Sequence, residues 1–162
     1  MKAIDFPALL RMLTEGNVEF IVVGGVAAIM HGSARGTFDL DVVHRRTPEN
    51  IQRLVNCLAP HSPYLRGAPP GLPFRFDADT IRRGLNFTLS TTLGPLDLLG
   101  EITGGGRYED LLADTMTAEL FGFTCRCLGL RKLIETKRAA GRPRDLDAVA
   151  ELEALLEKTK TS

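Results

Sequence analysis

The chain has 162 residues, which is enough for one domain with a substantial core and too few for two. Its 20 basic and 20 acidic residues balance, so we do not expect the whole molecule to be attracted to nucleic acid. The sequence has no apolar run of about 18 residues and no disulfide-like cysteine spacing, and its first residues suit an amphipathic helix rather than a signal peptide. We therefore expect a cytoplasmic protein without a membrane span.

The first third of the chain alternates helical and extended patterns. Apolar residues at helical spacing predict a helix over 4–13. A β-branched run over 19–23, which ends at two glycines, predicts a buried strand. Further along the chain we expect a short helix over 26–31, a loop over 32–38, a strand over 38–44 and a helix over 47–58 with Thr47 as its N-cap.

The rest of the chain mixes strands and helices without regular alternation. Residues 60–73 hold five of the nine prolines and are expected to form an irregular surface loop. We then expect strands over 74–76, 85–90 and 96–99, a turn at 104–106, a short helix over 108–112, and a strand pair over 119–127 turned at Gly122. Two helices, over 130–140 and 144–158, complete the pattern.

This order of elements predicts an α+β fold with a mixed β-sheet flanked by helices and a C-terminal helical pair. We expect a single domain over 1–162. Its sheet core, with the active site, would span 17–128, and its C-terminal helices 129–158.

Two aspartates stand two residues apart on the strand predicted over 38–44. Residues with that spacing on a strand share a face, so Asp39 and Asp41 should project together while Leu40 enters the core. Adjacent carboxylates repel each other unless water or a cation compensates them. Mg²⁺ prefers oxygen ligands, and a two-metal site needs a third carboxylate, for which Asp97 on a later strand is the candidate.

A pair of glycines, Gly24 and Gly25, lies between the strand over 19–23 and the helix over 26–31. A strand that turns into a helix at glycine exposes backbone N–H groups, which can bind phosphate. A tight turn without any ligand is the alternative interpretation of the same residues.

The spacing of these groups resembles a known signature. Gly24-Gly25, thirteen further residues and then Asp39-Leu40-Asp41, with Asp97 on a later strand, is similar to the pattern of the polymerase-β-like nucleotidyltransferase superfamily. More narrowly, the chain resembles the minimal and abortive-infection nucleotidyltransferases of bacterial toxin–antitoxin systems. Residues 31–38 are similar to their R-x-T-x-D-x-D segment, and 137–147 to their late basic-then-acidic helix. The resemblance covers residues 17 to 155.

The resemblance implies that Asp39, Asp41 and Asp97 are catalytic and hold two Mg²⁺ ions, and that Gly24 and Gly25 cradle a nucleoside triphosphate. It also implies transfer of a nucleoside monophosphate to an acceptor hydroxyl, with ATP among the possible donors. RNA, protein and small-molecule acceptors all remain open, as does a cognate toxin or antitoxin partner. One departure is Gly25, which stands where many members have serine, so that phosphate binding would rest on backbone N–H groups.

Four further residues are expected at the nucleotide. Arg35 could meet a phosphate and Thr37 could orient Asp39. Lys137 and Arg142 could reach the triphosphate or an RNA backbone, since seven basic residues and one acid lie between 126 and 144. A solvated helical face is the alternative for this basic segment.

Two alternatives to catalysis follow from the same residues. The chain could be a non-catalytic antitoxin or binding partner that keeps the fold. Three converging acids argue against a site that has lost its catalytic function. The two aspartates could also be structural ion-pair partners, for example of Arg35 or Arg45.

Overall fold

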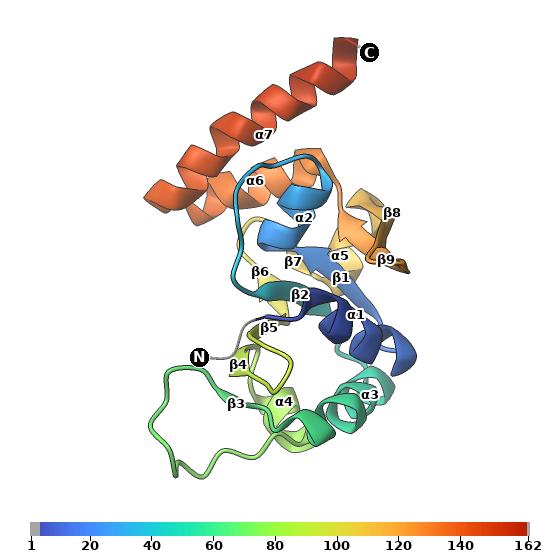
Figure 1. Cartoon of the computed structure of the whole chain (residues 1–162), viewed down its shortest axis with the longest axis vertical. Helices are drawn as coiled ribbons and strands as arrows, with labels where there is room; N and C mark the ends of the chain where they lie inside the picture. Colours follow the sequence, from blue (N-terminus) through green and yellow to red (C-terminus); the bar gives the residue numbers. More distant parts are fainter. Residues whose placement is uncertain (1–3, 162) are drawn as a thin grey trace.

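The structure is a computed structural model that describes residues 4–161 (Figure 1). Residues 1–3 and 162 of the expected domain lie outside this range. Its centre is a seven-stranded mixed sheet with the strand order β3-β4-β5-β2-β1-β9-β8. The strands are β1 (Phe20–Val23), β2 (Leu40–His44), β3 (Tyr64–Leu65), β4 (Asn86–Ser90), β5 (Leu96–Leu99), β8 (Thr115–Leu120) and β9 (Phe123–Leu128). A separate two-stranded ribbon is formed by β6 (Glu101–Ile102) and β7 (Gly106–Arg107).

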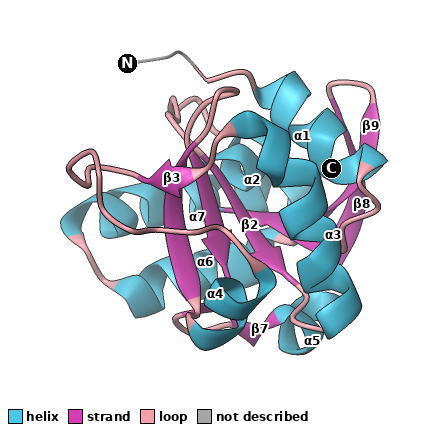
Figure 2. Cartoon of the chain, turned by 90° about the horizontal axis from the view of Figure 1, so that it is seen from below, coloured by secondary structure: helices cyan, strands magenta, loops and turns pink. Residues whose placement is uncertain are grey.

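Helices cover both faces of the sheet. They are α1 (Phe6–Glu15), α2 (Gly24–Met30), α3 (Pro48–Leu58), α4 (Ala78–Arg83), α5 (Tyr108–Leu111), α6 (Leu130–Ala140) and α7 (Pro143–Thr161). In Figure 2, α1, α3 and α4 lie on the near face of the sheet, and α6 and α7 on the far face together with α2. Among the described residues no helix combines the length and the apolar character needed to cross a bilayer.

Local sequence signals fix the helix ends. Asp5 accepts a hydrogen bond from Ala8 N at the start of α1, and Thr47 accepts one from Asn50 N at the start of α3. Gly141 adopts φ +68° and ends α6, so the chain turns back into α7.

The predicted α+β class, with a mixed sheet flanked by helices and a C-terminal helical pair, is confirmed. One predicted strand is wrong: residues 74–76 lie in an irregular segment that leads into α4, a helix that the sequence analysis missed. Asp77 begins this helix by accepting a hydrogen bond from Thr80 N. The alternating aromatic residues imitate a strand because Phe74 packs edge-on against Tyr64 and Phe76 is partly buried.

The proline-rich segment is also less irregular than expected. It contains the short edge strand β3, in which Leu65 pairs with Leu89 of β4. The strand pair around Gly122 is confirmed, but β8 already begins at Thr115.

Candidate functional site

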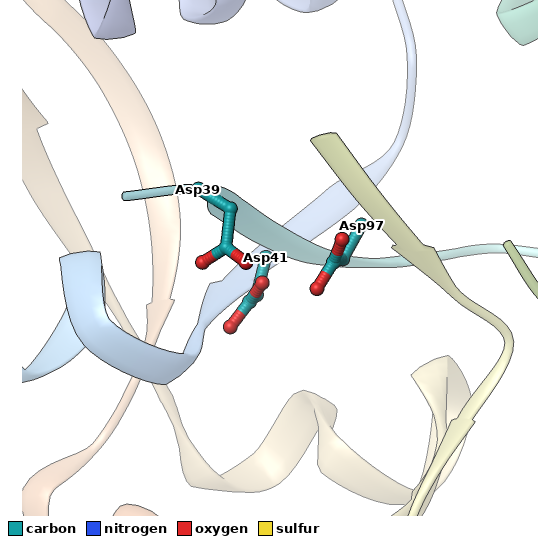
Figure 3. A group of neighbouring side chains, drawn as sticks. All are labelled: Asp39, Asp41 and Asp97. Carbon is teal, nitrogen blue, oxygen red and sulfur yellow. The ribbon is translucent and has the colours of Figure 1, made fainter. Parts of the chain in front are cut away.

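The three predicted carboxylates come together at one place on the sheet (Figure 3). Strands β2 and β5 are parallel neighbours, and their register places Asp41 directly opposite Asp97. Asp39 immediately precedes β2, two residues before Asp41, and therefore projects from the same face. One carboxylate oxygen from each residue lies within 4.8 Å of the others. Leu40 and Leu96, on the opposite face, are fully buried.

Burial makes this group of acids electrostatically costly. Desolvation and the adjacent charge of Asp39 raise the pKa of Asp41 to about 8. Desolvation also raises the pKa of Asp39, with the charge of Asp97 acting in the same direction. The Oδ1 atom of Asp41 is buried and has no hydrogen-bond partner among the described residues. These oxygens therefore have spare capacity to bind a cation.

The glycine pair packs directly against the site. Gly24 has φ +65°, and a Cβ atom on it would lie 2.1 Å from Oδ2 of Asp41. A Cβ on Gly25 would lie 2.5 Å from Oγ1 of Thr37. Close packing therefore explains why both positions are glycine: the β1–α2 turn approaches β2 and the loop before it too closely for a side chain.

A cavity of about 480 Å³ opens in front of the carboxylates. All nine residues predicted for catalysis, metal binding or nucleotide binding line it: Gly24, Gly25, Arg35, Thr37, Asp39, Asp41, Asp97, Lys137 and Arg142. The structure therefore brings together groups that are up to 118 residues apart in the sequence, the separation of Gly24 and Arg142.

The wall that α6 and α7 contribute to this cavity is basic. Lys137 of α6 lowers the pKa of Asp41 against the larger effect of burial, and Arg144 of α7 acts similarly on Asp39. Arg142, between the two helices, forms a salt bridge of 2.6 Å with Asp145, which is 4% exposed. Sequence reasoning missed Arg144 and Asp145 as individual lining residues, although both lie in the segment whose resemblance to the family was noted.

The loop before β2 is held by α7. Glu151 accepts hydrogen bonds from Ser33 Oγ at 2.5 Å and from Ala34 N at 3.0 Å. Thr37 Oγ1 donates to the backbone oxygen of Asp39 at 3.2 Å, which is compatible with the predicted orienting role of Thr37. Because of these contacts, Arg35 and Thr37 face the cavity from a fixed loop.

Sequence reasoning also missed Arg66, which follows β3. Its Nη2 donates to Asp97 Oδ1 at 2.7 Å, and its Nη1 lies 3.4 Å from Asp39 Oδ2. The alternative in which Arg35 or Arg45 pairs with the aspartates is not found among the described residues: Arg35 pairs with Glu151, and Arg45 pairs with Glu19 and Glu109. No sequence signal identified Arg66, because its place depends on how β3 pairs with β4.

Comparison with known proteins found a similar fold among the solved structures. No family model and no curated protein matches the chain. The crystal structure of the lincosamide antibiotic adenylyltransferase LnuA, with lincomycin bound, is similar at a TM-score of 0.62 and 12% identity, over 95% of this chain and 99% of that one. A candidate nucleotidyltransferase from Thermotoga maritima gives a TM-score of 0.49 at 16% identity, over 99% and 98%. The similarity to LnuA shows that the chain has a nucleotidyltransferase fold.

Proposed function

We propose that the protein is a metal-dependent nucleotidyltransferase that moves a nucleoside monophosphate from a nucleoside triphosphate to an acceptor hydroxyl. One observation carries this proposal: three carboxylates converge within 4.8 Å in a cavity whose facing wall holds Lys137, Arg142 and Arg144. An acidic centre beside a basic wall suits a metal-bound triphosphate. The nucleotidyltransferase fold of the chain is consistent with the same chemistry.

The residues present fit a divalent metal. Three carboxylates supply the hard oxygen donors that Mg²⁺ prefers, and the buried Oδ1 of Asp41 is without a partner among the described residues. Asp39, Asp41 and Asp97 would hold the metal, and two ions are expected. When bound, the metal would supply positive charge that stabilises the transition state and the departing pyrophosphate.

The protein's own groups have separate tasks in the reaction. Lys137, Arg142 and Arg35 would bind phosphate oxygens, and Gly24 and Gly25 would let the triphosphate approach the backbone. The acceptor oxygen would form a bond to the α-phosphorus while the bond to the β-phosphate oxygen breaks. The hydroxyl proton would pass to the carboxylate of Asp97, and pyrophosphate would leave.

For the acceptor of the nucleoside monophosphate, we propose chemical classes rather than one molecule. RNA, protein and small hydroxylated molecules are the candidates, and the last class gains support from the lincosamide named for LnuA. The toxin–antitoxin setting remains a prediction from the sequence, which co-expression with the product of the adjacent gene would test.

The testing experiment has two stages. Calorimetry with ATP, CTP, GTP and UTP should show binding of at least one triphosphate with Mg²⁺ and much weaker binding with EDTA. The α-³²P-labelled form of that nucleotide is then incubated with bacterial RNA, protein and metabolite fractions to find which becomes labelled. Binding to none of the four would contradict the proposal and leave the non-catalytic alternative.

A further inference from the structure

Arg66 places a positive charge between two of the three carboxylates. Its guanidinium contacts Asp97 Oδ1 at 2.7 Å and Asp39 Oδ2 at 3.4 Å. Its Nε and Nη2 also donate to the backbone oxygen of Leu89, at 3.2 and 2.7 Å. The side chain is 26% exposed, so these contacts lie partly out of water. Arg66 is thus anchored on β4 with its remaining hydrogen-bonding capacity aimed at the acids.

The contacts of Arg66 overlap those that a metal would need. A guanidinium and a divalent cation bind the same carboxylate lone pairs, and two positive charges a few ångströms apart repel each other strongly when partly shielded from water. Asp41 receives no contact from Arg66, and its Oδ1 is buried without a partner among the described residues. A cation could therefore bind first at Asp41. For the cation to bind all three carboxylates, Arg66 would then have to release its longer contact, the one with Asp39.

We propose that Arg66 is a built-in counter-cation of the acidic site, which a divalent metal must displace. This inference rests on the proposed metal-dependent function and concerns its regulation. Arg66 keeps Asp39 and Asp97 paired in the metal-free protein and lowers the affinity for metal. The site is thereby set to bind metal weakly until enough cation, or a metal-bound triphosphate, outcompetes the arginine.

The sign of the change in metal affinity tests this proposal. Mn²⁺ binding to the parent and to Arg66→Gln is measured by electron paramagnetic resonance at constant ionic strength, without nucleotide. The variant should bind Mn²⁺ about tenfold or more tightly, because the competing charge is gone. Mn²⁺ should also raise its melting temperature more than that of the parent. Arg75→Gln, at an exposed arginine nine residues further along the chain, is the matched control and should leave the affinity unchanged.

Arg66→Lys separates charge from geometry. Lysine keeps the charge but lacks the planar fork that spans two carboxylates, so its Mn²⁺ affinity should fall between those of the parent and the glutamine variant. If Arg66 only holds Asp97 in place, Arg66→Gln will bind Mn²⁺ equally well or more weakly, which overturns the inference while the proposed function stands. If neither the parent nor Arg66→Gln binds Mn²⁺, the metal-dependent function and this inference both fail.

Discussion

Gly24 and Asp41 are in such close contact that no side chain fits between them. A Cβ on Gly24 would lie 2.1 Å from Oδ2 of Asp41, and the residue has φ +65°. Gly24→Ala should therefore destabilise the protein by about 1–3 kcal/mol and move Asp41. Urea unfolding measures the loss, and Gly36→Ala is the control, since a Cβ there meets nothing within 4 Å. Equal stability of the two variants would contradict the packing argument.

Gly25 and Thr37 form a second close pair. A Cβ on Gly25 would lie 2.5 Å from Oγ1 and 2.7 Å from Cβ of Thr37. Gly25→Ala alone should destabilise the fold, and Thr37→Gly should relieve that clash in the double variant. A double-mutant cycle of unfolding free energies should give a favourable coupling of about 0.5–3 kcal/mol. Additive effects would show that Thr37 does not exclude a side chain at position 25.

The raised pKa of Asp41 predicts a pH dependence of stability. Its ordinary value is 3.8, and burial beside Asp39 raises it to about 8 in the folded protein. Between pH 3.8 and about pH 8, Asp41 therefore holds a proton in the folded protein that it has lost in the unfolded chain. The stability contributed by this group is complete below the unfolded pKa and is lost as the pH rises toward about 8. Without metal, the parent should lose stability relative to Asp41→Asn between pH 5 and pH 8.

The same group predicts the pH dependence of metal binding. A carboxylate must lose its proton to bind Mg²⁺, so the affinity should increase with pH up to about 8 and then level off. Calorimetry at pH 6.5, in buffers with different ionisation enthalpies, should detect proton release on Mg²⁺ binding. Binding without proton release would contradict the raised pKa.

Glu151 links α7 to the loop that presents Arg35 and Thr37. Because it accepts hydrogen bonds from Ser33 and Ala34, Glu151→Ala should loosen this loop. We expect triphosphate affinity to weaken by roughly threefold to tenfold, the equivalent of one or two lost hydrogen bonds. Glu157→Ala, on the same helix and in an ion pair with Lys160, is the control. Equal affinities would show that the loop keeps its place without Glu151.

Much of the candidate site could be predicted because its signals are local. The two-residue spacing of Asp39 and Asp41 fixes a shared face, and an isolated acid in an apolar strand identifies Asp97. The partner of these acids could not be predicted. Arg66 is 27 residues from Asp39 and 31 from Asp97, and it reaches both only through the pairing of β3 with β4. Helix α4 was missed because it has six residues and follows an aromatic alternation typical of a strand.

The last prediction separates a metal-binding role of the acidic pair from a structural one. Replacing both Asp39 and Asp41 by asparagine removes two acidic groups at similar volume. Arg66 would keep its 2.7 Å contact with Asp97, so no unpaired arginine would remain. Without metal, the double variant should be as stable as the parent or more stable, because the buried repulsion is gone.

Thermal melts with and without Mg²⁺ measure both properties of this double variant. The parent should be stabilised by Mg²⁺, and the variant should not, because it lacks two of the three ligands. Asp79→Asn, an exposed acid on α4, is the control and should keep the response to Mg²⁺. A loss of about 3–5 kcal/mol without metal would instead identify Asp39 as a structural partner of Arg66. That result would contradict the metal-binding interpretation of this strand. So would a double variant whose melting temperature Mg²⁺ raises as much as that of the parent.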